Sequence, residues 1–207
     1  MPSVDFRLLL ITDRLQTHGR SLPTVLRDAM QAGLQAVQIR ERGLSTLELV
    51  TLTKTVQAMT AGCAVSLLMN DRIDLVLALN LEGVHLRSDS LPVSVARQLL
   101  GPQRLVGLST HSSEDVRNAV REGADYVVFG PIFDTPSKKE FGPPLGLQAL
   151  EAVCREASIP VFAIGGITAA RIPAVRRAGA HGVAVIGAIL TRQDTMAATS
   201  ELLLELS

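Results

Sequence analysis

The stretch VFAIGGITAARI, residues 161–172, decides the fold of this chain together with VAVIGAI at residues 183–189. In each stretch a short apolar run ends in glycine and leads into a helical pattern. Glycine has no Cβ, so its backbone N–H can approach a ligand closely, and a helix that starts there directs free N–H groups at an anion. Two such turns late in a chain of strand–helix repeats are typical of the phosphate site of a (β/α)8 barrel. Two ordinary strand–helix turns are the alternative.

The same alternation runs outward from these turns through the whole chain. Short β-like runs are separated by segments with apolar residues three or four positions apart, such as PTVLRDAMQAGL at 23–34. The predicted strands are 7–12, 35–40, 65–69, 83–86, 104–108, 125–129, 161–164 and 182–186. Eight strand–helix units predict a closed α/β barrel, a single TIM-barrel domain over residues 1–207, rather than an open doubly wound sheet.

Composition limits the function classes. The 207 residues are 47% hydrophobic, enough for one domain with a large core. Lys plus Arg equals Asp plus Glu at 20 each, so no net field favours nucleic acid or an anionic membrane. The start lacks a signal-peptide pattern and no apolar run reaches membrane-spanning length. We expect a cytoplasmic protein that acts on a small molecule, and we leave open whether it forms a homodimer.

Polar side chains gather where the predicted strands end. Gln38 and Arg40 share one face of the strand in AVQIRER, and Arg42 lies just beyond. We expect Gln38 and Arg40 to point into the barrel near its carboxyl-terminal mouth. A partly buried arginine there needs an anionic ligand or, alternatively, a structural ion pair.

Asn70 and Asp71 end the third strand. The Asp71 carboxylate could ligate a hard cation such as Mg2+. It could equally cap the next helix, and spacing alone slightly favours the cap.

The fifth strand ends in GLSTHSSEDV, where Gly107, Ser109 and His111 alternate onto one face. An imidazole at this position can exchange protons near neutral pH, which makes His111 a candidate acid or base. The alternative is that a following serine caps a helix and His111 is merely solvated. His85 lies within a strand and is expected to be structural.

A long helix-breaking connection, residues 130–146, follows the sixth strand and would lie on the active face of a barrel. Thr135, Ser137, Lys138 and Lys139 bring hydroxyl and ammonium groups together in it. Such a group suits a phosphate or diphosphate. A mobile, solvated loop is the alternative.

These motifs, in this order, resemble the thiamine-phosphate synthase/TenI superfamily. The resemblance runs from ITDR at 11–14 to VIGAI at 185–189 and includes the following pieces: QIRER (38–42), MNDR (69–72), GVHL (83–86), STH (109–111), GADYVVFGPIF (123–133), TPSKK (135–139) and AIGGI (163–167). It implies a (β/α)8 barrel and a thiazole phosphate ligand. It also implies one of two chemistries. The synthase joins hydroxymethylpyrimidine diphosphate to thiazole phosphate with Mg2+ and loss of diphosphate, whereas the TenI-type tautomerase shifts a proton in carboxythiazole phosphate and needs no metal.

The resemblance places the synthase's pyrimidine-diphosphate residues at Gln38, Arg40, Asn70, Ser109 and Lys138. It places the first Mg2+ ligand at Asp71. The second ligand closes a G-Q-x-D motif in the synthase, but the matching stretch here is Arg87 to Ser90, and Ser90 stands at the aspartate position. A neutral hydroxyl cannot replace a carboxylate charge, and Asp89 would serve only if the loop shifted.

Ser90 and Arg42, which replaces the synthase's lysine, both favour the tautomerase, while Asp71 favours the synthase. Gly187 replaces a serine often found in the last phosphate turn. We therefore favour a metal-free thiazole tautomerase in which His111 is the general acid/base and Arg40 holds the substrate carboxylate. The phosphate would bind the backbone around Gly165, Gly166, Gly187 and Ala188.

Two alternatives remain. The first is a thiamine-phosphate synthase with an altered Mg2+ site. The second is a non-catalytic regulator or small-molecule sensor, for which DNA contact is disfavoured because the chain has no net positive charge.

Overall fold

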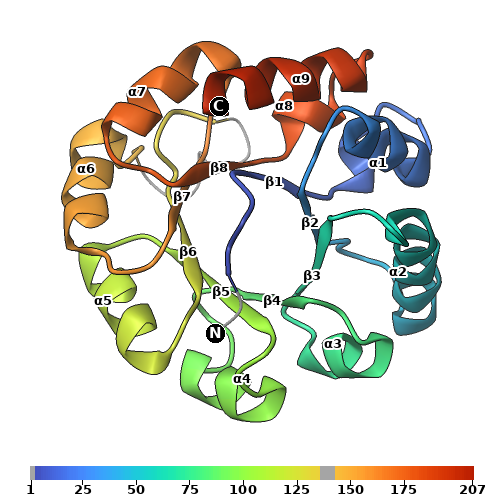
Figure 1. The fold of residues 1–207 in the computed structure, drawn as a ribbon, viewed down its shortest axis with the longest axis horizontal. Helices are drawn as coiled ribbons and strands as arrows, with labels where there is room; N and C mark the ends of the chain where they lie inside the picture. The colour runs from blue at the N-terminus through green and yellow to red at the C-terminus, as the bar shows by residue number, and fades with distance from the viewer. Residues whose placement is uncertain (1–2, 136–142) are drawn as a thin grey trace.

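A computed structural model describes residues 3–135 and 143–207. Its eight parallel strands close into a barrel in chain order, with β8 pairing to β1. Figure 1 looks along the barrel, with the helices arranged around the ring of strands. The predicted (β/α)8 fold class is therefore confirmed.

All eight predicted strands are present, with ends shifted by at most two residues. Their bounds are β1 Leu8–Ile11, β2 Ala36–Ile39, β3 Ser66–Asn70, β4 Gly83–Leu86, β5 Leu105–Thr110, β6 Tyr126–Phe129, β7 Val161–Ile164 and β8 Gly182–Val185. The largest difference is β5, which continues through Ser109 and Thr110 because these residues pair with Val128 and Phe129 of β6.

The helices form the outer layer. Their bounds are α1 Leu22–Gln31, α2 Thr46–Thr60, α3 Ile73–Leu79, α4 Val93–Leu100, α5 Ser113–Glu122, α6 Gly146–Glu156, α7 Ile172–Arg177, α8 Gly187–Leu190 and α9 Thr195–Leu206, with short 3-10 helices at η1 Arg14–Gln16 and η3 Ala169–Arg171. Capping boxes start α2, through Ser45 and Glu48, and α5, through Ser112 and Asp115. None of the helices in the described ranges is long and apolar enough to cross a membrane.

The apolar residues form two layers because strand side chains alternate between the faces of the sheet. The larger layer lies between the strands and the helices. The smaller one fills the barrel and includes Phe6, Tyr126 and Phe162 in mutual ring contact. The polar side chains Gln38, His85 and Ser109 also point into the interior, beside this aromatic floor and the other apolar residues.

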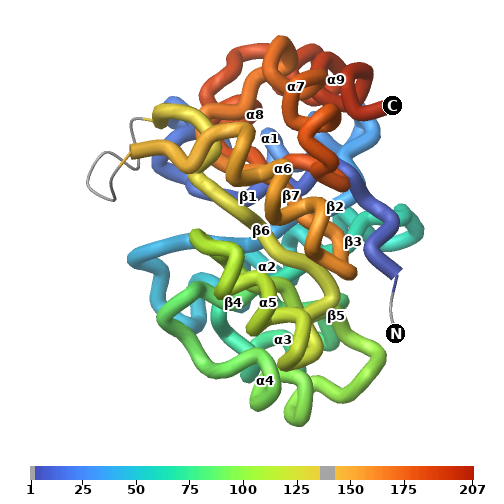
Figure 2. Tube along the Cα trace, turned by 90° about the vertical axis from the view of Figure 1, so that its left-hand side faces the viewer, coloured from blue at the N-terminus to red at the C-terminus, as the bar shows by residue number. Residues whose placement is uncertain are grey.

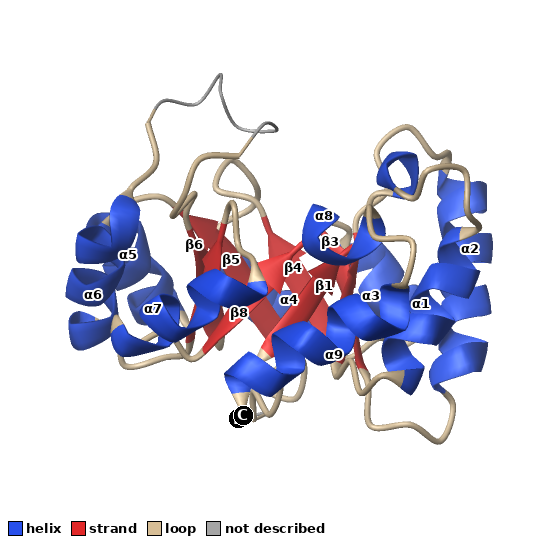
Figure 3. Ribbon diagram, turned by 90° about the horizontal axis from the view of Figure 1, so that it is seen from above, coloured by secondary structure: helices blue, strands red, loops and turns tan. Residues whose placement is uncertain are grey.

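The long connection after β6 leaves the barrel at the carboxyl ends of the strands, as predicted (Figure 3). Figure 2 shows the beginning of the described chain at the opposite end of the barrel. The first glycine turn differs from the expectation that a helix starts directly after the glycines. Ile167 and Thr168 follow Gly166 before η3 begins, and α7 starts after η3. Gly187 does start a helix, α8, but this helix has only four residues.

Candidate active site

Polar side chains from neighbouring strands meet inside the carboxyl-terminal mouth of the barrel. The Gln38 Nε2 on β2 donates to the Asn70 Oδ1 at the end of β3 over 2.9 Å. Gln38 is 1% exposed, and its Oε1 is buried without a hydrogen-bond partner among the described residues. A buried acceptor of this kind is costly unless a ligand or water satisfies it. Gln38 therefore offers an acceptor to a donor group of a bound molecule.

Arg40 and Arg42 place positive charge at the same mouth. Arg40 directly follows β2 and is half-buried, with its backbone N held by the Thr12 Oγ1 at 2.9 Å. No ion pair of the described chain involves Arg40, so the structural ion pair considered as an alternative is not present. Burial and the nearby Arg42 both lower the pKa of Arg40. An anionic ligand beside Arg40 would offset both effects, because it favours the charged guanidinium.

Glu41, between the two arginines, was missed by the sequence reasoning. Its carboxylate is almost fully buried and accepts two hydrogen bonds of 3.1 Å from the Arg14 backbone N. The Arg14 side chain also lies 3.5 Å from it. Glu41 therefore fixes the loop after β1 to the end of β2. The sequence signal for this role was an acidic residue placed between two arginines at a strand end.

Asp71 does not cap a helix, so the slightly favoured interpretation was wrong. The chain turns through a left-handed conformation at Asp71, with φ of 62°, and Arg72 is the N-cap of α3. The Asp71 Oδ1 is buried and has no partner among the described residues, whereas its Oδ2 lies 3.5 Å from the Arg87 Nε. The turn thus presents a free carboxylate oxygen at the mouth.

The segment after β4 does not add a second metal-binding carboxylate to Asp71. The Arg87 guanidinium donates to both oxygens of the exposed Asp89, at 2.9 and 2.8 Å. Ser90 is half-buried, and its backbone N donates to the Arg87 carbonyl. Within residues 3–135 and 143–207, no three His, Cys, Asp or Glu residues cluster closely enough to hold a metal. A cation at Asp71 would therefore need oxygens from a substrate or water.

Ser109 is joined to two buried residues below it. Its Oγ lies 2.9 Å from the His85 Nε2, and the His85 Nδ1 lies 3.1 Å from the Tyr126 hydroxyl. His85 is buried, and burial lowers its pKa to about 3. The imidazole is therefore neutral near pH 7 and has one donor and one acceptor nitrogen.

His111 lies just beyond β5 and is tied to the loop after β6. Its Nδ1 lies 2.6 Å from the carbonyl oxygen of Gly130, which can only accept, so Nδ1 carries a proton. Ser112 caps α5, as the alternative interpretation had it. The imidazole is nevertheless anchored rather than merely solvated.

The two glycine turns lie side by side because β7 and β8 are paired. Gly165 and Gly166 have φ of 97° and 62°, and they are packed beneath the loop after β6. A Cβ on Gly165 would lie 2.6 Å from the Pro131 Cβ, and one on Gly166 would lie 2.6 Å from the Asp134 carbonyl oxygen. The structure thus brings these glycines together with Gly187 and Ala188 at adjacent strand ends. It also gives the first pair a packing role besides any contact with a ligand.

Arg171 bridges the first glycine turn and the loop after β6, a contact that the sequence reasoning did not predict. Its guanidinium donates to the Gly166 carbonyl oxygen over 2.5 Å and lies 4.6 Å from the centre of the Phe133 ring. Thr135 is half-buried in the same loop. The predicted phosphate contacts Ser137 and Lys138 lie outside the described residues.

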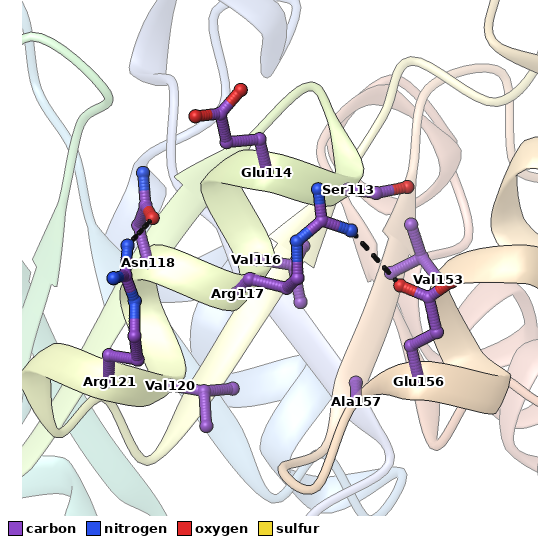
Figure 4. Close-up of a pocket in the computed structure, with 10 residues that line it drawn as sticks. All are labelled: Ser113, Glu114, Val116, Arg117, Asn118, Val120, Arg121, Val153, Glu156 and Ala157. Atoms are coloured by element: carbon purple, nitrogen blue, oxygen red, sulfur yellow. Dashed lines mark hydrogen bonds and ion pairs between the residues drawn. The ribbon is translucent and has the colours of Figure 1, made fainter.

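Two surface hollows lie away from this constellation. A groove of about 510 Å3 lies between α5 and α6, and the Arg117–Glu156 ion pair of 3.1 Å crosses it (Figure 4). A second hollow, of about 740 Å3, is lined by residues of η1, α1 and α2. None of the predicted site residues lines either hollow, although the second is lined in part by Arg14, the partner of Glu41.

The fold and the polar mouth define an α/β-barrel protein of the kind that acts on small molecules at the carboxyl ends of its strands. A family model described as thiamine monophosphate synthase matches residues 8–189. A putative thiamine-phosphate synthase of Geobacter sulfurreducens is 45% identical over 94% of this chain and 91% of its own length. A thiamine-phosphate synthase of Roseiflexus castenholzii is 40% identical over 93% of this chain and 85% of its own length. The chain belongs to the thiamine monophosphate synthase family.

A solved structure agrees with this assignment. The thiamine phosphate pyrophosphorylase from Pyrococcus furiosus superposes with a TM-score of 0.87 at 32% identity, covering 97% of this chain and 95% of that one.

The favoured tautomerase interpretation is wrong. Relatives that are 38–45% identical are named as thiamine-phosphate synthases, and nothing in the comparisons indicates a tautomerase. The error came from giving weight to Arg42 and Ser90. Arg42 is exposed, and Ser90 lies in a segment where Arg87 already pairs with the neighbouring acid. The isomerase role of His111 falls with that interpretation.

Proposed function

We propose that this protein is a thiamine-phosphate synthase, which joins hydroxymethylpyrimidine diphosphate to thiazole phosphate and releases diphosphate. The observation that carries the proposal is the buried Oδ1 of Asp71, which has no partner among the described residues, in a carboxylate that lies 3.5 Å from Arg87. Such an oxygen could bind a cation that neutralises the charge of a diphosphate. The family membership supports the same reaction.

The pyrimidine diphosphate would bind over β2, β3 and β5. Arg40 and Arg42 supply charge for the diphosphate, and the Ser109 hydroxyl supplies a short hydrogen bond. The free Oε1 of Gln38 would accept from a donor on the pyrimidine, while its Nε2 is held by Asn70. Thr135, Ser137 and Lys138 would complete the diphosphate contacts from the loop after β6.

The thiazole phosphate would bind across the mouth, over β7 and β8. Backbone N–H groups around Gly165, Gly166, Gly187 and Ala188 are the proposed contacts. Because glycine has no side chain, a phosphate oxygen can approach this backbone closely. The two substrates would then face each other over the aromatic floor.

In the reaction, the bond between the pyrimidine methylene carbon and the diphosphate oxygen breaks, and a bond from that carbon to the thiazole nitrogen forms. Negative charge grows on the departing diphosphate. Fixed positive groups aimed at that charge lower the barrier because they need no reorganisation during the step. Among the described residues, Arg40 and Arg42 would supply such groups.

The residues fit a Mg2+ ion held by one carboxylate, because no donor among the described residues reaches the Oδ1 of Asp71. Mg2+ is commonly bound through one or two carboxylates together with substrate phosphates. When bound, the ion would neutralise diphosphate charge. Ser90 would contribute no charge to it.

The test is to incubate the protein with both substrates and Mg2+ and to separate the products by chromatography. We expect thiamine phosphate to form only when both substrates are present. Binding of both substrates without formation of thiamine phosphate would contradict the proposal. Carboxythiazole phosphate, run in parallel, identifies any isomerase activity.

A further inference from the structure

Three residues lie in one row across the inside of the barrel, on β4, β5 and β6. His85 pairs in register with Gly107, and Gly107 pairs with Tyr126. A Cβ on Gly107 would lie 2.1 Å from the Tyr126 Cζ. The missing side chain at Gly107 therefore lets the Tyr126 ring cross β5 and reach His85.

The direction of the Tyr126–His85 hydrogen bond follows from burial. Tyr126 is 0% exposed, and its ring is enclosed by Phe6 and Phe162, with centroids at 5.9 and 5.6 Å. Within the described chain, the hydroxyl's hydrogen bond is to the His85 Nδ1, at 3.1 Å. A buried O–H without an acceptor is costly, so the hydroxyl donates and Nδ1 accepts.

This direction sets the tautomer of His85. An Nδ1 that accepts from the Tyr126 hydroxyl carries no proton itself, so the ring is in a neutral form with one proton. With Nδ1 accepting, that proton is on Nε2, which donates to the Ser109 Oγ 2.9 Å away. The Ser109 hydroxyl then keeps its own proton for another acceptor. In the opposite tautomer, Nε2 would accept the Ser109 proton, and the hydroxyl could not donate it to a ligand.

We propose that Tyr126 and His85 are positioning residues that orient the Ser109 hydroxyl as a hydrogen-bond donor toward an anionic oxygen of the pyrimidine diphosphate. The identity of that anion rests on the proposed function. The relay itself rests on the buried contacts of Tyr126, His85 and Ser109. His85, which the sequence led us to expect as a structural residue, thereby has a role in ligand binding.

The main test is a double-mutant cycle on the binding of inorganic diphosphate, measured by calorimetry in the presence of Mg2+. Tyr126→Phe keeps the ring in the aromatic floor and removes only the hydroxyl. We expect Tyr126→Phe and Ser109→Ala each to weaken diphosphate binding by about five- to tenfold, as for a lost hydrogen bond to a charged group. In the Ser109→Ala background, Tyr126→Phe should change binding by less than about twofold, because the relay acts through Ser109.

His181→Gln is the matched control. His181 is also a partly buried histidine that contacts the aromatic floor, through Phe162, but its Nε2 lies 3.2 Å from the Phe6 carbonyl oxygen and not near Ser109. It should leave diphosphate binding unchanged. The proposal would be overturned if Tyr126→Phe weakened diphosphate binding equally in the wild-type and Ser109→Ala backgrounds. It would also be overturned if Ser109→Ala bound diphosphate as tightly as the wild type.

Long-range 1H–15N NMR of the wild-type protein provides a readout that depends on neither mutation nor turnover. We expect the His85 Nε2 to carry the proton and Nδ1 to be unprotonated at pH 7. A proton on Nδ1 would overturn the relay even if thiamine phosphate forms. A protein with the expected tautomer and binding cycle but no product would instead refute the proposed reaction.

Discussion

Asp71 shows how one residue's backbone decides its chemistry. Its left-handed φ of 62° turns the carboxylate away from the helix that it was expected to cap. One carboxylate oxygen is left buried without a partner in the described chain, and the other faces Arg87 at 3.5 Å. The Oδ1 is therefore open to a bound cation, while the Oδ2 keeps its contact with Arg87.

Asp71→Asn keeps the shape of this side chain and removes its charge. We expect the Mg2+-dependent rate of thiamine phosphate formation to fall at least about 100-fold, since a metal-held charge on a leaving group is worth several kcal/mol. The measurement is the initial rate across a Mg2+ titration. An unchanged titration curve would remove Asp71 from the metal site.

Ser90→Asp adds the second carboxylate that this chain lacks. We expect the Mg2+ concentration for half-maximal rate to fall, by about threefold or more, because a second acidic ligand favours a hard cation. Ser88→Asp, an exposed position in the same segment, is the control and should leave that concentration unchanged. A rise or no change in the Ser90→Asp protein would place this segment away from the cation.

His85 makes stability depend on pH. Its pKa is lowered to about 3 in the folded protein, whereas an unfolded histidine titrates near pH 6.5. Below about pH 6.5 only the unfolded chain takes up this proton, so stability falls as pH falls toward 3. We expect the wild-type free energy of unfolding to lose up to about 1.4 kcal/mol per pH unit from this group between pH 6 and 5.

Urea unfolding at pH 7, 6 and 5 checks this slope against His85→Gln. The variant is expected to be less stable at pH 7 but to lack this component of the slope. His181, whose pKa is also lowered by burial, is present in both proteins and cancels in the difference. Parallel stability curves for the two proteins would contradict a neutral, buried His85.

At the scale of elements, the close approach of β5 and β6 depends on Gly107. An added methyl group would meet the Tyr126 ring at 2.1 Å. We expect Gly107→Ala to lower the free energy of unfolding by about 2 kcal/mol or more, the usual cost of overpacking a barrel core. Gly62→Ala, which meets nothing within 4 Å but has φ of 81°, should cost about 1 kcal/mol from backbone strain alone. Equal costs in urea titrations would show that the Tyr126 ring can move aside.

The elements themselves could largely be predicted from the sequence. Apolar periodicity located all eight strands. These features are local, so a single sequence contains them. The delayed start of α7 was missed, because the apolar pattern after Gly166 does not distinguish η3 from an α-helix.

The site was only partly predictable. Gln38 and Ser109 were placed on the correct strand faces because alternation is a local rule. The bridge from Ser109 through His85 to Tyr126 depends on the register of three strands, which no local pattern specifies. The contacts of Arg171 with Phe133 and of Arg87 with Asp71 also join different loops. The choice of reaction needed relatives as well as motifs.

At the scale of the whole molecule, barrel closure brings distant parts of the sequence to one mouth. The pairing of β8 with β1 places the glycine turns beside the loop fixed by Glu41, so that residues near 40 and near 187 share one end of the barrel. A parallel barrel gathers all its strand ends in this way. A cytoplasmic location stays a prediction of the sequence, and whether the chain forms a homodimer stays open.

We predict that this mouth couples two substrates and releases diphosphate. Time-resolved 31P NMR of one sample with protein, Mg2+, pyrimidine diphosphate and thiazole phosphate tests it most directly. We predict that the signals of free diphosphate and of thiamine phosphate rise together in a one-to-one ratio. Unchanged signals from both substrates, or diphosphate release without thiamine phosphate, would contradict the claim.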